Sequence, residues 1–473
     1  MPVVALVFAA VLVATASRYG PHRDELYFLA AGRRLDLGYP DQPPLVPFLA
    51  RAAAAIDADS LLLLRAAAIL AATAVVVCAG LLAREFGGGR VAEALAAAAC
   101  AGAALLLAAG HLLGTTVFDL AAWTLICLLV VRLVRGADPR WWLAVGVVTG
   151  LGLQNKLLLA VPVAVLVVTL LLCGPRRVLR TRWFGAGVGV AVLIWTPYLW
   201  WQARHGFPQW EVGSAIAGGS SGTSDDRAGF VVLQAGLVGP LLLPVWLLGL
   251  WWLWRRPEFR AFALAYPLLF ALFLVAGGKA YYLGGMYPVL LAAAAVPIAR
   301  WLGENRTRWA AAVSVLVVNA AGAAVLFLPI LPAAALRDSP VLAVNYDAGE
   351  TIGWPRLVAQ VAAARPPGAP VLTANYGEAG AIERYGAEHG LPVPYSGHNA
   401  YWWWGPPPDS ATTVLTVGIG RDRLTGLCGV LEPAGTLDNG LGIDNDEQGA
   451  PLFVCRDPVR PWSQVWPRLR TLG

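Results

Sequence analysis

A succession of long apolar runs, separated by breaks rich in charged residues, proline or glycine, constrains this chain more than any other feature. A transmembrane helix needs about 20 predominantly apolar residues, and 58% of the chain is hydrophobic whereas 14% is charged. Soluble proteins of 473 residues do not have this composition. The pattern predicts an all-α polytopic membrane protein with about 11 transmembrane helices, over residues 3–17, 61–83, 91–110, 115–134, 141–153, 157–173, 183–201, 229–254, 261–277, 283–299 and 309–331.

Three details of these runs carry expectations of their own. The first run is short, but no Lys or Arg precedes it and further runs follow, so we interpret it as a transmembrane helix rather than a signal peptide. The two short runs flanking the sequence LQNK, residues 153–156, could form one helical hairpin. Arg65 lies near the outer end of the second run, where we expect its side chain to snorkel to the interface.

The charged breaks indicate which side of the membrane each loop occupies. Arginines in short loops mark the cytoplasmic side, and they gather in the breaks at residues 84–90, 132–140, 176–182, 255–260 and 300–308. The remaining breaks, including the long first loop at residues 18–60, are therefore predicted outside. The formal net charge of +6 is explained by these loops and does not indicate a nucleic-acid partner.

The chain changes character after Leu331, where Pro, Gly, Asn and Asp become frequent. Strand-like pieces (PVLTANY, ATTVLTVGI and PLFVC) alternate with a helical stretch, TIGWPRLVAQVAAA. We expect a transmembrane domain at residues 1–333 and a small extracytoplasmic α/β domain at 334–473, in a multi-pass protein of the plasma membrane. Cys428 and Cys455 are the two cysteines of this tail, and an extracytoplasmic location makes a disulfide between them plausible.

Isolated charges at the predicted outer ends of the runs are the candidate site. Lys156 and Lys279 are the two lysines of the chain; each could snorkel, or together they could bind a phosphate at the outer leaflet. Asp24 and Glu25 follow the first run, and Asp119 lies about a turn into the fourth, as a helix-terminal acid or a functional one. Carboxylates and lysines on one face suit the transfer of a sugar from a lipid phosphate, and the chain has no nucleotide-binding motif.

Aromatic residues concentrate at the predicted membrane interfaces, where they form the usual aromatic belt. The sequence PYLWWQARHGFPQWE continues beyond the belt with His205, Trp210 and Glu211, which could instead contact a sugar or a prenyl chain. The Gly/Ser-rich stretch behind it, residues 214–226, is expected to be either a lid or a plain surface loop.

Five segments of the chain resemble the GT-C glycosyltransferases of the glycosyltransferase 39 type, which include protein O-mannosyltransferases and the bacterial lipid A aminoarabinose transferases. They are HRDELYFLAAGRRLDLGYPDQPPLVPFLAR, TTVFDLAAW, GLGLQNKLLLAVP, PYLWWQARHGFPQWE and GGKAYYLGGMYPVLLAA. The tail, with NYGEAGAIERYG and YSGHNAYWWWGPPP, looks like that of actinobacterial members. Its aromatic cluster with His398 could contact an acceptor, or could belong to a tightly packed small domain.

The resemblance implies an inverting hexosyltransferase that moves a sugar, mannose or another hexose, from a polyprenyl-phosphate donor to an unknown acceptor outside the cytoplasm. Asp24 matches the general base, Glu25 its neighbour, and Asp119 the second acid, which with Asp24 could hold Mg²⁺ or Mn²⁺. Tyr27 is assigned to the substrate pocket. The residues matched to the donor phosphate are Lys279, Tyr282 and, more weakly, Lys156, whereas Gln42 stands where some relatives have a basic residue.

Two alternatives from other classes stay open. A lipid-linked sugar transporter or flippase would also be polytopic, but coupling charges in transporters usually lie near the bilayer midplane and between repeated halves. The acids here cluster at one predicted face, and the chain shows no such repeat. A membrane-anchored binding protein would place its whole function in the tail.

Overall fold

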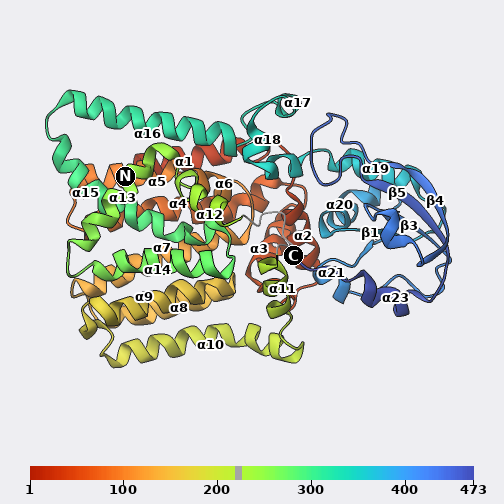
Figure 1. Cartoon of the computed structure of the whole chain (residues 1–473), viewed down its shortest axis with the longest axis horizontal. Coiled ribbons are helices and arrows are strands. Elements are labelled where there is room, and N and C mark those ends of the chain that lie inside the picture. Colours follow the sequence, from red (N-terminus) through yellow and green to blue (C-terminus); the bar gives the residue numbers. More distant parts are fainter. Residues whose placement is uncertain (219–225) are drawn as a thin grey trace.

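The protein, as a computed structural model that describes residues 1–218 and 226–473, has a helical body and a smaller tail that contains a sheet. Figure 1 shows the body at the left and the tail at the right, with two short helices between them. The apolar helices of the body are α1 (Pro2–Thr15), α4 (Leu61–Glu85), α5 (Arg90–Ala101), α6 (Ala104–Gly110), α7 (Thr115–Val134), α8 (Trp141–Leu153), α9 (Ala160–Cys173), α10 (Arg182–Arg204), α12 (Arg227–Gly236), α13 (Leu243–Trp254), α14 (Arg260–Ala276), α15 (Tyr287–Leu302) and α16 (Arg306–Phe327).

Every predicted apolar run falls on one of these helices or on a pair of them. By length and composition, however, 5 helices among the described residues could cross a membrane, or up to 7 if each of two bent pairs is one span. Other predicted spans, such as α1, α8 and α14, have 10–17 residues and are short for a bilayer. The positions of the runs are confirmed, whereas the count of about 11 spans is not.

The breaks in the two bent pairs are hydrogen-bonded by the same side chain. The axes of α5 and α6 differ by 64°, and those of α12 and the segment Pro240–Trp254 by 81°. A break in a helix frees carbonyl groups that must find other donors inside a membrane. The buried Asn319 amide on α16 donates to the carbonyls of Gly102 and Val238, at 2.9 and 3.0 Å. The N–H of Leu105 also donates to the carbonyl of Leu237, so the two breaks lie side by side.

The two helices between body and tail are α2 (Arg23–Arg33) and α3 (Leu45–Ile56), both from the long first loop. The side chain of Glu25 reaches back to the His22 N–H and so closes a capping box at the start of α2. The same carboxylate forms a buried ion pair with Arg65 of α4, at 2.7 and 2.9 Å. Arg65 is 1% exposed and also donates to the carbonyls of Ala16 and Gly20, so the expectation that it snorkels is wrong.

The tail follows α16 and folds around a five-stranded sheet with the order β2-β1-β3-β5-β4. The strands are β1 (Val371–Thr373), β2 (Tyr395–Ser396), β3 (Thr413–Val417), β4 (Cys428–Thr436) and β5 (Pro451–Pro458). Strand β1 runs parallel to β2 and β3, whereas β5 is antiparallel to β3 and β4. Three of these strands and α19 (Trp354–Ala364) lie on the predicted pieces, and the disulfide Cys428–Cys455 joins β4 to β5 as the sequence indicates.

The tail also has several short elements. They are α17 (Ala333–Leu336), α18 (Val341–Val344), η5 (Tyr346–Thr351), α20 (Tyr376–Tyr385), η6 (Gly386–His389), α21 (Ala400–Trp403), α22 (Arg421–Leu424) and α23 (Trp462–Leu469). Of these, α20 packs against α2 of the first loop. Leu26 of α2 packs in the same hydrophobic cluster as Trp354 and Val417 of the tail. At Gly380, an added Cβ would lie 2.8 Å from Leu26, so α2 and α20 approach too closely for a larger residue. The tail and the first loop therefore share one core.

Candidate functional site

Asp24 lies at the start of α2, where the body meets the tail. Its side chain is 46% exposed, and one oxygen accepts a hydrogen bond of 2.7 Å from the hydroxyl of Tyr376 on α20. The other oxygen lies 4.0 Å from Nδ1 of His22. The carboxylate is thus held by groups on both sides yet keeps access to solvent, as a general base must.

Asp119, near the start of α7, and Lys156, in the bend between α8 and α9, lie close enough to interact electrostatically. Nζ of Lys156 lies 5.0 Å from the ring centroids of both Tyr281 and Tyr282, which belong to η4 (Ala280–Met286). The Tyr281 hydroxyl in turn is within electrostatic range of Asp24 and Asp119. The structure therefore brings Asp119, Lys156 and Tyr282 to the same end of the body as Asp24.

Lys279 is the residue immediately before η4. It interacts electrostatically with Asp347 of the tail, and Asp347 lies 3.7 Å from Nε2 of His22. Through His22 and Asp347, Lys279 is connected to the neighbourhood of Asp24. Both lysines and the two acids Asp24 and Asp119 therefore gather at one end of the helical body.

Nearby carboxylates shift the pKa of the buried His22 ring. Burial alone would lower the pKa of His22, but the carboxylates of Asp347 and Asp24 outweigh it and raise the pKa to about 8. In the neutral ring, Nδ1 accepts the N–H of Asp24; in the charged ring, the Nδ1 proton faces the Asp24 carboxylate. Burial raises the pKa of Asp347, but His22, Arg23 and Lys279 together hold it below its usual range.

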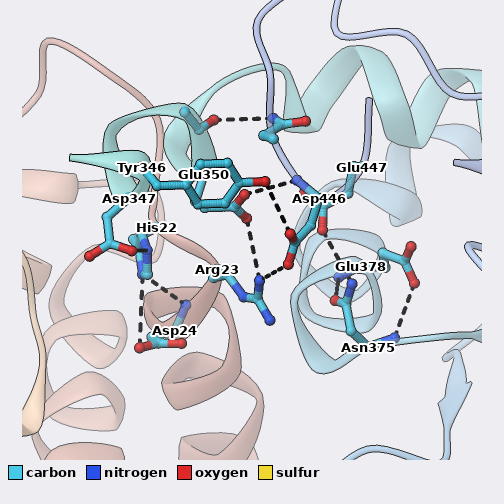
Figure 2. A network of polar contacts seen from close by, with 12 residues as sticks. His22, Arg23, Asp24, Tyr346, Asp347, Glu350, Asn375, Glu378, Asp446 and Glu447 are labelled. Atoms are coloured by element: carbon cyan, nitrogen blue, oxygen red, sulfur yellow. Dashed lines mark hydrogen bonds and ion pairs between the residues drawn. The ribbon is translucent and has the colours of Figure 1, made fainter. Parts of the chain in front are cut away.

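A dense polar network surrounds Arg23 on the tail side of the site (Figure 2). The guanidinium pairs with Asp446 and lies 3.6 Å from Glu350. Asp446 also accepts a hydrogen bond from the Tyr346 hydroxyl, and its N–H donates to Glu350. Beside this network, burial raises the pKa of Glu378 to about 8. The network fixes the tail on α2, and its carboxylates are mostly occupied by protein donors.

Glu25 and Tyr27 are placed differently from Asp24, although they share its helix. The side chain of Glu25 is fully buried, and its oxygens accept from Arg65, from the N–H of His22 and from the N–H of Leu113. These donors leave no oxygen of Glu25 facing a substrate. Tyr27 is 2% exposed, and its hydroxyl donates to Asp41 at 2.7 Å. Both residues support α2 and do not line an open pocket.

His205, Trp210 and Glu211 gather around a separate contact between α10, α11 (Pro208–Ala217) and the tail. The His205 ring stacks on Trp201 at a centroid distance of 4.0 Å and lies edge-on to Trp403 of the tail. Glu211 pairs with Arg470 at 2.6 Å, and Trp210 is 81% exposed. His205 and Glu211 thus contact the tail, away from the acids and lysines above. Most of the Gly/Ser-rich stretch, residues 219–225, lies outside the described residues.

The carboxylates of Asp24 and Asp119 are of the chemical type that binds a divalent ion. Oδ1 of Asp119 is buried and has no hydrogen-bond partner among the described residues, as an oxygen awaiting a cation would be. Among the residues that the structure describes, no group of three His, Cys, Asp or Glu side chains could hold a metal ion without other ligands. A Mg²⁺ ion is often held by one or two carboxylates together with substrate phosphates and water. The residues present fit an ion of that kind, and the metal stays a prediction.

Several residues of the site were not predicted from the sequence. Tyr376 and Asp347 belong to the tail, and Tyr376 lies 352 positions from the aspartate that it contacts. Asp41, in the first loop, accepts from Tyr27 and senses the charge of Asp24, and burial raises its pKa to about 6. Asp41 lies in the same loop as Asp24, and this proximity was the one feature of the sequence that could have indicated it. No feature of the sequence indicated the tail residues, because polar residues are common there.

Comparisons with known proteins place this architecture in a class. The chain combines a body of apolar helices long enough in part to span a membrane, a small tail packed on the first long loop, and a cluster of acids and lysines at that end of the body. None of the curated proteins matches the sequence significantly. A family model described as "Dolichyl-phosphate-mannose-protein mannosyltransferase" matches residues 41–201, a range that includes Asp119 and Lys156 but neither Asp24 nor Lys279.

Solved structures match nearly the whole chain. ArnT from Cupriavidus metallidurans in the apo state has a TM-score of 0.62 and 16% identity, over 96% of this chain and 97% of that one. ArnT bound to undecaprenyl phosphate has a TM-score of 0.60 and 18% identity, over 96% of both chains. An oligosaccharyltransferase from Archaeoglobus fulgidus has a TM-score of 0.50 and 13% identity, over 90% of this chain and 69% of that one. The fold is that of the GT-C glycosyltransferases, as the resemblance implies.

Proposed function

We propose that this protein is an inverting glycosyltransferase that moves a sugar from a polyprenyl-phosphate donor to an acceptor hydroxyl outside the cytoplasm. The observation that carries the proposal is the meeting of a partly exposed carboxylate, Asp24, with Asp119 and both lysines at one end of the body. Carboxylates without cations would not favour a departing phosphate, and lysines without a base would not activate a hydroxyl.

The reaction follows from these placements. The acceptor oxygen attacks the anomeric carbon and forms the new glycosidic bond, while Asp24 takes the proton of the acceptor hydroxyl. The bond between the anomeric carbon and the phosphate oxygen breaks, and its electron pair leaves with the polyprenyl phosphate. Lys156 and Lys279 stabilise the charge that develops on that phosphate, and Tyr282 lies beside Lys156 as a further contact for the donor. A divalent ion held by Asp119 and Asp24 would add positive charge there.

The nature of the donor rests on the comparisons. One of the similar structures is ArnT bound to undecaprenyl phosphate, which supports a polyprenyl carrier for this chain as well. The description of the matching family supports mannose, and another hexose would fit the same chemistry. The disulfide Cys428–Cys455 supports a location of the tail outside the cytoplasm, because disulfides persist in oxidising compartments.

A single assay tests the proposal. The purified full-length protein is incubated in detergent with a radiolabelled polyprenyl-phosphate mannose and a crude cell-envelope extract as the source of acceptor. We expect the label to leave the lipid fraction and to appear on an acceptor. Label that stays on the lipid, but crosses the bilayer when the protein is reconstituted in vesicles, would support the transporter alternative instead. Addition of EDTA tests the metal: transfer falls if the predicted Mg²⁺ or Mn²⁺ takes part.

A further inference from the structure

We propose that the tail supplies two positioning residues for Asp24: Tyr376, which holds the carboxylate directly, and Asp347, which holds it through His22. The inference rests on the proposed function, in which Asp24 is the base. It assigns to the tail a part in the reaction, beyond packing or acceptor binding. Figure 2 shows the line from Asp347 through His22 to Asp24, with both acids on the same side of the Arg23 network.

Tyr376 is fixed in one position by its neighbours. Its hydroxyl donates to Oδ1 of Asp24 at 2.7 Å. Its ring is stacked between Tyr27 and His398, at centroid distances of 4.7 and 4.6 Å, and the guanidinium of Arg23 lies 5.2 Å from the same ring. Burial and the negative charge of Asp24 raise the pKa of Tyr376 well above its ordinary value, so the hydroxyl keeps its proton and remains a donor.

The second oxygen of Asp24 depends on the tail as well. Nδ1 of His22 lies 4.0 Å from Oδ2 of Asp24, and Nε2 of the same ring lies 3.7 Å from Oδ1 of Asp347. A histidine whose far nitrogen faces a carboxylate is fixed in orientation and favoured in its charged form. Each oxygen of Asp24 is therefore flanked by a group that the tail provides or orients.

This arrangement controls how Asp24 can act as a base. A base must aim one lone pair at the acceptor hydroxyl and stay ionised until the transfer. Hydrogen bonds donated to a carboxylate restrict its rotation. The charged and titratable groups that face Asp24 come from several elements: His22 and Arg23 beside it, Asp41 in the first loop, Tyr281 in η4 and Tyr376 in α20. Of these, Tyr376 is the group whose hydroxyl bonds the carboxylate directly.

The decisive variant is Tyr376→Phe, which keeps the stacked ring and removes the hydroxyl. We expect kcat to fall about tenfold to a hundredfold, the scale of one hydrogen bond to a charged group, while the KM for the donor stays within about twofold of wild type. The split between kcat and KM is the readout, because the loss of a donor contact would raise KM instead. A merely structural role for Tyr376 would lower the folded fraction, which thermal unfolding measures, and would leave the kcat of the folded protein unchanged.

Two further variants complete the test. Tyr346→Phe is the matched control, because it removes another tail hydroxyl, the one bonded to Asp446 at 3.1 Å, without touching Asp24. Its kcat and its KM for the donor should equal those of wild type. Asp347→Asn, at a side chain that is 55% exposed, should lower kcat by a smaller factor and leave the KM for the donor unchanged. Because this site is partly exposed, the variant tests the inference even if Tyr376→Phe fails to fold, and Asp347→Glu should recover part of the loss.

The outcomes separate the two levels of the proposal. A wild-type protein that releases no label from the lipid overturns the proposed function itself. The positioning role alone is overturned if wild type and Tyr346→Phe transfer sugar normally and Tyr376→Phe and Asp347→Asn have an unchanged kcat. A rise in donor KM with constant kcat also contradicts it, because that result would make the tail residues donor contacts.

Discussion

The two sides of the site differ in how their charged groups are paired. On the body side, Oδ1 of Asp119 has no hydrogen-bond partner among the described residues, and Lys156 rests on the faces of two tyrosines. On the tail side, Arg23, Asp446 and Glu350 pair with one another, although Nε of Arg23 and Oε2 of Glu350 also have no hydrogen-bond partner among the described residues. Unsatisfied groups in a buried position cost free energy unless a ligand completes them. Ion pairing therefore distinguishes the tail side, and under the proposed function the body side receives the donor phosphate while the tail side positions Asp24.

The largest effect should come from the residue at the boundary between the two sides. Asp24→Asn keeps the size of the side chain and removes the base, so transfer should fall by about 10²–10⁴-fold, while donor affinity remains near wild type. Label transfer and donor titration in detergent measure the two quantities. Asp57→Asn, an exposed acid at the end of α3, is the control and should retain full activity. Full activity in Asp24→Asn would remove the role assigned to it.

The next largest effect should be on stability rather than on chemistry. Glu25→Gln leaves the buried charge of Arg65 without its partner and should destabilise the protein by about 3–5 kcal/mol, seen as a lower Tm. Glu85→Gln is the matched control, because Glu85 pairs with Arg132 and Arg135 in a more exposed setting and should cost less than about 1 kcal/mol. A stable but inactive Glu25→Gln protein would indicate instead that Glu25 takes part in the reaction.

The contact between the sides should weaken as pH rises. The folded-state pKa of His22 is about 8 against an ordinary 6.5, so its stabilisation is complete below pH 6.5 and is lost as pH rises through 8. The shift corresponds to about 2 kcal/mol. Glu378, with its pKa raised from 4.5 to about 8, changes stability in the same direction. Thermal unfolding at pH 6 and pH 9 measures the loss, and Asp347→Asn should make it smaller. An equal decrease in Tm from pH 6 to pH 9 in wild type and Asp347→Asn would contradict the His22–Asp347 pair.

The smallest effect should come from a single lysine on the body side. Lys279→Ala should weaken donor binding about tenfold, or about 1.4 kcal/mol, and change kcat less than that. Lys279→Arg keeps the positive charge and should bind the donor nearly as well as wild type. Donor titration checks both variants, and unchanged affinity in Lys279→Ala would count against a contact with the phosphate.

The helical body could be located from the sequence, but not its breaks. Apolar runs alone place the helices, because burial in lipid selects them. The bends between α5 and α6 and between α12 and α13 depend on Asn319, whose partners Gly102 and Val238 lie 217 and 81 positions away. Arg65 was misjudged for the same reason: its partner Glu25 lies 40 positions earlier. Long-range pairing of this kind leaves no local pattern.

The site could be predicted on the body side and not on the tail side. Asp24, Asp119 and the two lysines stand out because ionisable groups are rare and costly among apolar helices. Tyr376 and Asp347 do not stand out, because polar residues are ordinary in a soluble tail. Strand β4 was missed as well: its sequence CGVLEPAGT contains Gly and Pro, which are uncommon in strands but tolerated at the edge of a sheet, where β4 lies.

The amide of Asn319 has a mechanical consequence for the body. Its nitrogen donates one hydrogen bond to a carbonyl at each of the two breaks, so a displacement of either break that keeps its bond must move the Asn319 amide as well. The two breaks are thus tied to each other through one side chain of α16. Any displacement that a bulky lipid imposes on one interrupted helix would thus be transmitted sideways to the other.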